Sequence, residues 1–297
     1  MDDVGRALEV IRAGGLVAIP TETVYGLAAD ASNEDAVRRI FAAKGRPADH
    51  PLIVHIAAAE QLADWAAEVP DAAARLADTC WPGPLTLLVP KAARVLPVVT
   101  GGRPTVGVRV PAHPLTAELL ERFGGGLAAP SANRFGMVSP TTAQHVIDDL
   151  GDAVDFVLDG GPCPVGVEST IVDCTVKPAQ VLRPGGIPTE QVEEILGEIA
   201  PAAGPSRASG MLASHYAPTA RVLLAETRAE AMVLLQGLEH GELVDRSDDL
   251  VDYAQHLYAD LRSADEHGAR TIVAVLPPAA GLGHAIRDRL SKAAAAR

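Results

Sequence analysis

Two patterns of hydrophobic and polar positions alternate along residues 1–200. Apolar positions spaced three or four residues apart predict helices over 33–43, 60–79, 114–123, 141–150 and 189–199. Short apolar runs bounded by Gly, Pro or Asp predict strands. These runs are Leu16–Ile19, Leu52–Ile56, Leu85–Val89, Val106–Val110, Phe156–Leu158, Thr170–Val172 and Val181–Leu182. Strands and helices mixed at this density predict an α/β domain around one twisted sheet.

The end of the chain predicts a second, smaller α/β unit over residues 219–297. Its strands are expected at Arg221–Leu224 and Thr271–Leu276, and its helices over 227–240, 251–263 and 283–294. The stretch Ile199–Met211 is rich in small residues, Pro and Gly, which is typical of a linker without a core of its own. We therefore expect a domain at 1–200, a linker at 201–218 and a domain at 219–297.

The overall composition narrows the class of protein. Of the 297 residues, 48% are hydrophobic and 21% charged, as in an ordinary globular protein. Apolar runs are far shorter than the roughly 20 residues that span a bilayer, and the N-terminus does not have the order of a signal peptide. Three cysteines without a CxxC pair disfavour a disulfide framework and a zinc site. We expect a cytoplasmic protein with no membrane contact and no metal ligands of its own.

The charge and the missing motifs exclude further classes. The net charge is −13, and residues 1–205 carry 15 Lys and Arg against 26 Asp and Glu, which disfavours a protein that coats nucleic acid through an overall basic field. The chain contains no GxxxxGK[ST], GxGxxG, HExxH or GxSxG motif. Any phosphate chemistry must therefore rely on side chains and irregular loops.

The loop Pro20–Gly26 follows the first predicted strand and holds two hydroxyls, a carboxylate and a phenol. Loops at strand ends often carry binding sites, and this polar set suits a small zwitterion. An equally good alternative is a turn that caps the next helix.

Two groups of cations are candidates for binding anions. Lys44 and Arg46 precede Pro47, so they are expected on one face of an extended segment, where both could reach a polyphosphate. Arg109 lies on the same face of its predicted strand as Thr105 and Gly107, and its planar fork suits a carboxylate. The alternatives are a solvated surface pair for the first group and an internal salt bridge for Arg109.

Further hydroxyls and an arginine occur at predicted turns and strand ends, in Ala129–Asn133, Ser139–Thr141, Val167–Thr170 and Leu182–Gly186. Singly, each of these is ordinary turn chemistry. In Ser209–Pro218, glycine precedes the cluster His215-Tyr216, a pattern that suits a lid. A domain hinge with a structural tyrosine is the alternative there.

Taken in order, these motifs resemble the YrdC-like family. The ordered set is Pro20–Gly26, Lys44–Pro47, Pro51–Ile56, Pro82–Thr86, Val108–Pro111, Ser131–Asn133, Glu168–Thr170 and Arg183–Gly185. With Ser209–Pro218, the whole chain resembles the two-domain form of threonylcarbamoyl-AMP synthase, well over residues 5–218 and loosely beyond. The resemblance implies a YrdC-like domain on a twisted mixed sheet, followed by a small Rossmann-like α/β accessory domain.

The resemblance also implies an activity. A nucleotidyltransferase of this family converts L-threonine, bicarbonate or CO2 and ATP into L-threonylcarbamoyladenylate and pyrophosphate. The product passes to a tRNA threonylcarbamoyl transferase, for modification of adenosine 37 in tRNAs that read ANN codons. Mg²⁺ is expected to accompany the ATP.

Site residues follow from the resemblance by motif position. L-Threonine would be bound by Thr23, His55, Arg109, Ala129 and Ser169. ATP would be bound by Arg46, His50, Thr105, Ser131, Ser139, Arg183 and Tyr216. Lys44 and Arg46 would be catalytic.

Two departures from the family pattern stand out. His50 occupies a position where the family has asparagine, so its contact would depend on pH. The segment after Pro218 is shorter than the usual accessory domain. Two rival functions share the fold: a non-catalytic module that binds double-stranded RNA, and a carbamoyl-transfer domain of the hydrogenase-maturation type. The second normally lies in a longer chain with zinc-finger cysteines.

Overall fold

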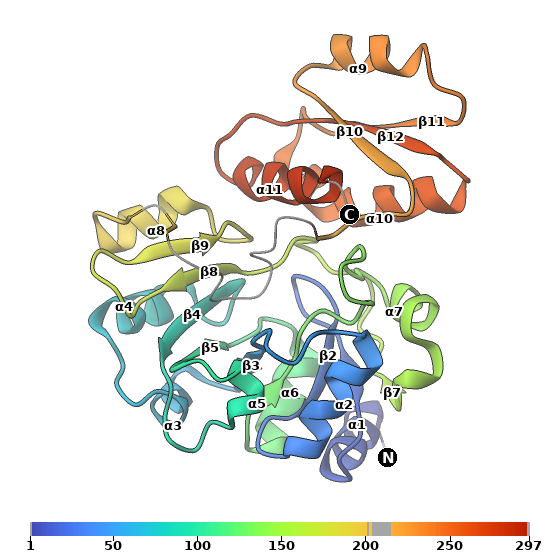
Figure 1. The fold of residues 1–297 in the computed structure, drawn as a ribbon. Coiled ribbons are helices and arrows are strands. Elements are labelled where there is room, and N and C mark those ends of the chain that lie inside the picture. The colour runs from blue at the N-terminus through green and yellow to red at the C-terminus, as the bar shows by residue number, and fades with distance from the viewer. Residues whose placement is uncertain (1, 201, 204–214, 296–297) are drawn as a thin grey trace.

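The computed structural model describes residues 2–200, 202–203 and 215–295. Within these residues, nine strands form one mixed sheet and three more form a separate parallel sheet (Figure 1). The expected fold class, a large mixed-sheet α/β domain followed by a smaller α/β domain, is therefore confirmed.

The large sheet brings together strands that lie far apart in the sequence. Across the sheet the order is β7 (Phe156–Val157), β1 (Val17–Ile19), β2 (Gly26–Asp30), β6 (Leu127–Ala128), β3 (Ile53–His55), β5 (Thr105–Arg109), β4 (Leu85–Pro90), β8 (Thr170–Asp173) and β9 (Gln180–Arg183). Strand β3 is parallel to β5 and places His55 beside Arg109. Ends of the central strands thus carry two of the expected site residues to one edge of the sheet.

Helices cover both faces of this sheet. One face packs against α1 (Asp3–Arg12) and α6 (Pro114–Phe123). The other packs against α2 (Glu34–Lys44), α4 (Asp71–Cys80), α7 (Ala143–Leu150) and α8 (Thr189–Leu196). The shorter helices α3 (Leu62–Trp65) and α5 (Pro97–Thr100) lie in connections. Small and branched aliphatic residues fill both cores, as the low aromatic content requires.

The end of α2 sets the position of the Lys44–Pro47 motif. The side chain of Asn33 accepts a hydrogen bond from the amide of Ala36 and caps the start of the helix. Gly45 ends it with φ 62°, a left-handed conformation that glycine adopts without steric cost. Lys44 is therefore the last helical residue, and the chain turns before Arg46 rather than running extended through both cations.

The second domain is a three-layer unit around the parallel sheet β10–β12–β11. It comprises β10 (Arg221–Ala225), α9 (Arg228–Leu235), β11 (Gly241–Val244), α10 (Leu250–Glu266), β12 (Thr271–Val275) and α11 (Gly283–Ala294). Helix α9 packs on one face, whereas α10 and α11 pack on the face toward the large domain (Figure 1). Although this segment is short, it forms a three-stranded sheet with helices on both faces.

The two domains share a hydrophobic core. Val24, Val138 and Val167 of the large domain lie in the cluster that α10 and α11 form with β12. Gly166 has φ 76°, and a Cβ there would lie 2.4 Å from the carbonyl oxygen of Ala254 in α10, so glycine is needed where the domains meet. The second domain is thus packed into the large one rather than tethered to it.

The linker expected at 201–218 falls largely outside the described residues, and so does the Ser209–Gly210 part of the expected lid. No helix in the described parts of the chain combines the length and apolar character that a membrane crossing requires.

Candidate active site

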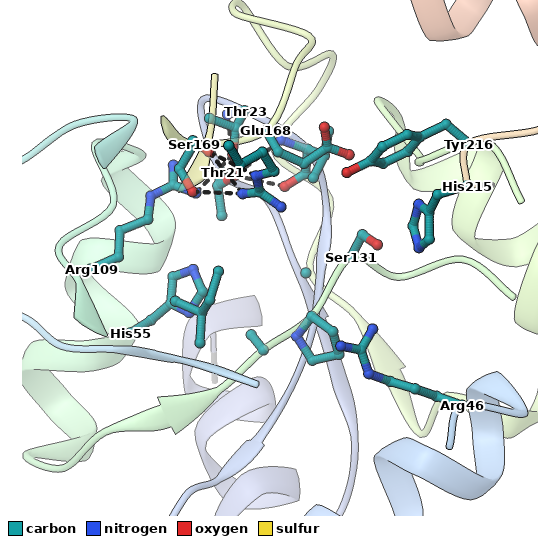
Figure 2. Close-up of a pocket in the computed structure, with 16 residues that line it drawn as sticks. Thr21, Thr23, Arg46, His55, Arg109, Ser131, Glu168, Ser169, His215 and Tyr216 are labelled. Atoms are coloured by element: carbon teal, nitrogen blue, oxygen red, sulfur yellow. Dashed lines mark hydrogen bonds between the residues drawn. The ribbon is translucent and has the colours of Figure 1, made fainter. Parts of the chain in front are cut away.

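A cavity at the strand ends of the large domain collects most of the expected site residues (Figure 2). It is lined by nine of them: Thr23, Arg46, His55, Arg109, Ala129, Ser131, Ser169, Arg183 and Tyr216. Arg109 and His55 lie on one side, which we call the Arg109 end, and Arg46, His215 and Tyr216 on the other, the Arg46 end. Ser131 lies between the two ends, so a ligand with two differently charged parts would fit along the cavity.

At the Arg109 end, a buried guanidinium is held by three partners. Its Nε donates to the carbonyl oxygen of Gly83 (3.2 Å) and its Nη1 to Oγ1 of Thr23 (2.9 Å). Its Nη2 lies 2.7 Å from Oε1 of Glu22, and both side chains are less than 10% exposed. The internal salt bridge that the sequence left as the alternative is therefore present, and it fixes the guanidinium at the wall of the cavity.

The hydroxyls of the Thr21–Thr23 turn are ordered by the loop itself. Oγ1 of Thr21 donates to the carbonyl oxygen of Val24 (2.6 Å) and lies 2.8 Å from Oγ1 of Thr23. Glu22 accepts a hydrogen bond from the amide of Ala112 (3.0 Å). The segment is therefore a self-bonded turn that presents hydroxyls to the cavity. The alternative of a turn that caps the next helix is wrong, because the loop leads into strand β2 and helix α2 is capped by Asn33.

His55 contributes a neutral ring to the same end. Burial, together with the nearby charge of Arg109, lowers its pKa to about 3. At neutral pH the imidazole is therefore uncharged, and its Nδ1 has no hydrogen-bond partner among the described residues. A neutral ring aimed into the cavity can accept or donate one hydrogen bond to a ligand without adding charge.

Ser169 and Arg183 form a connected polar pair above the sheet. Nε and Nη2 of Arg183 donate to the carbonyl oxygen of Ser169 (3.1 and 2.8 Å), and Nη2 also donates to its hydroxyl (3.1 Å). That hydroxyl lies 2.8 Å from Oγ1 of Thr86 in β4. Arg183 therefore brings a buried positive charge to the wall of the cavity.

Arg46 and Tyr216 dominate the other end. Nη2 of Arg46 donates to the carbonyl oxygen of Pro51 (3.0 Å), and its guanidinium lies 5.7 Å from the centre of the Phe135 ring. Burial lowers its pKa to about 10, so it stays charged at neutral pH. Tyr216 has φ 61°, a left-handed conformation that is costly for an aromatic residue and persists only where the surroundings enforce it.

Lys44 does not line the cavity. It is buried, and its ammonium donates to the carbonyl oxygens of Ser131 (2.6 Å) and Asn133. Burial and the charge of Arg46 hold its pKa well below the usual range. The structure thus gives Lys44 the task of fixing the Ser131–Asn133 loop, one layer behind the cavity wall.

Three other expected residues also lie outside the cavity lining. His50 is near Arg46 but packs edge-on against Phe135, with ring centres 5.2 Å apart. Thr105 begins β5, four residues from Arg109, and pairs with Pro90. Ser139 is fully buried and donates its hydroxyl to Oε1 of Glu168 (2.6 Å). Gly107, on the same strand as Thr105, packs against Thr86, whose Cγ2 would lie 3.3 Å from an added Cβ.

The cavity lining also contains three polar residues that the sequence did not single out as ligands, namely Thr21, Glu168 and His215. Thr21 and Glu168 belong to motifs noted above, but nothing in their residue type distinguished them from their neighbours. His215 belongs to the aromatic cluster noted above, in which Tyr216 alone was assigned to a ligand. Burial lowers the pKa of His215 to about 3, despite the opposing charge of Glu168. The sequence could not predict that Glu168 lines the cavity, because two of its partners, Tyr258 and Arg289, lie in the second domain.

The residues present can be tested for a fit to Mg²⁺. The carboxylate on the cavity wall, Glu168, is already paired with Arg289, and Glu22, which does not line the cavity, is paired with Arg109. In the described parts of the chain, no group of three His, Cys, Asp or Glu side chains is placed to hold a metal. The arrangement suits a metal that arrives bound to a phosphate ligand, not one held by a protein cage.

Family profiles match nearly the whole chain. Residues 9–185 match the Sua5/YciO/YrdC profile, described as "Telomere recombination". Residues 187–295 match the profile described as "Threonylcarbamoyl-AMP synthase, C-terminal domain". The boundary between the two profiles lies near residue 186, before helix α8. In the structure, α8 packs against the core of the large domain.

Relatives of similar length carry one name. The chain is 43% identical to the threonylcarbamoyl-AMP synthase of Pyrococcus abyssi, over 97% of this chain and 92% of that protein. It is 41% identical to the threonylcarbamoyl-AMP synthase of Bacillus subtilis, over 99% of this chain and 93% of that protein.

Solved structures agree with this relationship. P. abyssi Sua5 complexed with L-threonine matches with a TM-score of 0.93 at 42% identity, covering 98% of this chain and 94% of that one. A full-length HypF structure matches with a TM-score of 0.56 at 18% identity, covering 63% of this chain and 30% of that one, which shows a shared fold alone.

Proposed function

Because the chain belongs to the Sua5/YrdC family of threonylcarbamoyl-AMP synthases, we propose that it forms L-threonylcarbamoyladenylate and pyrophosphate from L-threonine, bicarbonate or CO2 and ATP. One observation carries the proposal. Arg109 and Arg46, the two arginines that would bind a carboxylate and a polyphosphate, line opposite sides of one cavity (Figure 2). The complex of P. abyssi Sua5 with L-threonine supports the choice of amino acid.

The Arg109 end would hold the amino acid. The carboxylate of threonine would accept hydrogen bonds from the guanidinium of Arg109, whose orientation is fixed by Glu22, Thr23 and Gly83. The hydroxyls of Thr23 and Ser169 and the neutral ring of His55 offer partners for the remaining polar atoms. This geometry would leave the threonine amine directed along the cavity toward the Arg46 end.

The Arg46 end would hold ATP with its Mg²⁺, which enters as part of the substrate. The charges of Arg46 and Arg183 would stabilise the phosphates, and the backbone near Ser131 would lie along the nucleotide. The threonine nitrogen bonds to the carbon of CO2 and loses a proton, giving a carbamate. A carbamate oxygen then attacks the α-phosphorus, and pyrophosphate leaves as the P–O bond to it breaks.

We also propose a place for this reaction. A mixed anhydride of a carbamate and AMP is labile, so a tRNA threonylcarbamoyl transferase must take it up for adenosine 37 of tRNAs that read ANN codons. A cytoplasmic setting fits this sequence of steps and the three free cysteines, which are all buried.

Pyrophosphate release tests the activity. The protein is supplied with MgATP, bicarbonate and each of the amino acids in turn, and the product is identified by mass spectrometry. We expect release that depends on both threonine and bicarbonate, with the mass of threonylcarbamoyl-AMP. Binding of double-stranded RNA without any turnover would instead favour the non-catalytic module. Release with carbamoyl phosphate in place of bicarbonate and threonine would favour the hydrogenase-maturation type.

A further inference from the structure

The second domain contacts Glu168, a carboxylate close enough to His215 and Tyr216 to interact electrostatically with both, so Glu168 belongs to the Arg46 end. Glu168 lines the cavity, is buried, and belongs to the large domain. Its Oε2 accepts hydrogen bonds from Nε of Arg289 in α11 (2.7 Å) and from the hydroxyl of Tyr258 in α10 (2.8 Å). Its Oε1 accepts the hydrogen bond from Ser139. One oxygen of a cavity carboxylate is therefore held by the second domain.

The same two side chains of the second domain also hold Tyr216. The Tyr216 ring stacks on Tyr258, with centres 5.8 Å apart, and the guanidinium of Arg289 lies 5.0 Å from the centre of the Tyr216 ring. Arg289 is completely buried and is fixed from behind, where its Nη1 donates to the carbonyl oxygen of Pro184 (3.0 Å) and to Asp288 (2.6 Å). This packing supplies the enforcement that the left-handed backbone of Tyr216 requires.

The charges at the Arg46 end show why this matters for an anionic ligand. Glu168 is a carboxylate on the wall of the cavity that would receive the triphosphate, and repulsion between like charges is strong where water is excluded. Arg289 does not line that cavity, so it neutralises the carboxylate without occupying space that a ligand needs. Without that charge, Arg46 and Arg183 would have to offset Glu168 as well as the phosphates.

We propose that Arg289, assisted by Tyr258, is a positioning residue for the nucleotide: it neutralises Glu168 and fixes Tyr216, so that the second domain sets the affinity for ATP without touching it. This inference rests on the proposed function for the identity of the nucleotide. It assigns the second domain a task in substrate binding rather than in stability alone. It also explains why a residue as costly to bury as arginine lies at the domain interface.

The test measures the KM and Kd for ATP and, separately, the KM for threonine in the variant Arg289→Met. We expect the KM and the calorimetric Kd for ATP to rise about tenfold, as for truncation of one partner in a buried charge pair, while the KM for threonine stays within about twofold. In the Glu168→Gln background, the carboxylate is gone, so Arg289→Met should change the Kd for ATP by less than about threefold. Arg287→Met, on the same helix but paired with Glu226 at the surface, is the control and should bind ATP like the wild type.

Tyr258→Phe keeps the ring stack and removes only the hydroxyl bonded to Glu168. It therefore tests the proposal even if Arg289→Met does not fold. We expect its Kd for ATP to rise about threefold, and to rise less in the Glu168→Gln background. The inference is overturned if both folded variants bind ATP like the wild type, or if either raises the threonine KM as much as the Kd for ATP. It is also overturned if Tyr258→Phe, which leaves the packing on Tyr216 intact, weakens ATP binding equally in the Glu168→Gln background. Wild-type protein that binds ATP but never turns over threonine would refute the proposed function instead.

Discussion

The two ends of the cavity are built in different ways. At the Arg109 end, the partners of the arginine are Glu22, Thr23 and Gly83, all from loops of the large domain. At the Arg46 end, Glu168 and Tyr216 are held by Tyr258 and Arg289 of the second domain. If the ends bind the ligands proposed for them, recognition of the amino acid would be a property of one domain, whereas recognition of the nucleotide would depend on how the two domains pack. Variants at the two ends should therefore fail in different ways.

Replacing Arg109 by alanine should have the largest effect. The catalytic efficiency kcat/KM for threonine should fall about 100-fold, as expected for losing charge-assisted hydrogen bonds, while the Kd for ATP stays within about twofold. Glu22 would be left buried without its counter-charge, so the free energy of unfolding should also fall by about 3 to 5 kcal/mol. The sequence alone predicts that activity suffers far more than stability, whereas the buried ion pair leads us to expect a substantial loss of stability as well. Kinetics and urea unfolding measure the two effects.

A paired variant separates these effects. Glu22→Gln with Arg109→Gln removes both charges, so most of the stability should return, while threonine use stays impaired. Normal threonine kinetics in either variant would show that Arg109 is not the carboxylate clamp. If these variants weakened ATP binding by as large a factor as threonine use, the two ends would not be independent.

The free energy of unfolding should depend on the ionisation of Glu168 at low pH. Burial alone would raise the pKa of Glu168, but the charges of Arg289 and Arg183 and the hydrogen bond from Ser139 outweigh it and lower the pKa to about 2, from an ordinary value of 4.5. Because the folded-state pKa lies below the unfolded one, the carboxylate stabilises the fold above pH 4.5, and this contribution is lost as the pH falls toward 2. The loss amounts to about 3 kcal/mol, at roughly 1.4 kcal/mol per pKa unit.

Urea unfolding of the wild type and Glu168→Gln between about pH 7 and about pH 3 measures this contribution. The glutamine cannot titrate, so the difference in unfolding free energy between the two proteins should shrink as the pH falls below 4.5. Parallel curves for the two proteins across this range would mean that Arg289 does not stabilise the ionised form of Glu168.

The sequence predicted the strongly apolar strands well, but it predicted weakly patterned strands and the ends of helices less well. Strongly apolar strands such as β4 and β8 were found within a residue or two. Strand β2, with the sequence Gly-Leu-Ala-Ala-Asp, was missed because it lacks β-branched residues and becomes a strand only by pairing with β1 and β6. The expected helix over 60–79 is broken before Asp71, since Pro70 starts a new helix there.

At the site, sequence reasoning could identify residues whose type is unusual for their position. Arg109 on an apolar strand is such a residue, and so is the aromatic cluster at His215-Tyr216. It could not identify Glu168 as a cavity residue or Arg289 as its partner, because a contact over 121 residues leaves no local pattern. Lys44 shows the opposite error: the sequence predicts that a cation beside Arg46 faces the ligand, whereas the end of helix α2 turns it toward the Ser131–Asn133 backbone.

The smallest effect is expected at His50, which lies behind the Arg46 end. It contacts Phe135, and Phe135 in turn packs against Arg46 and His215, so the packing contact of His50 with the cavity wall is indirect. Partial burial and the charge of Arg46 lower its pKa from the usual 6.5, so it is neutral above that pH. His50→Asn should therefore change the KM for ATP by less than about threefold, with no difference in its pH dependence between about pH 7 and 8.

Arg46→Gln is the matched comparison, because it removes a charge from the cavity wall beside the same ring. It should raise the KM for ATP about tenfold, with threonine binding unchanged, while His50→Asn leaves both nearly as they are. If His50→Asn instead weakened ATP binding as much as Arg46→Gln, or made it lose a pH dependence that the wild type has, the histidine would be a direct ligand of the nucleotide. The nucleotide site would then extend past Phe135, and His50 would belong to the wall of the cavity together with Arg46.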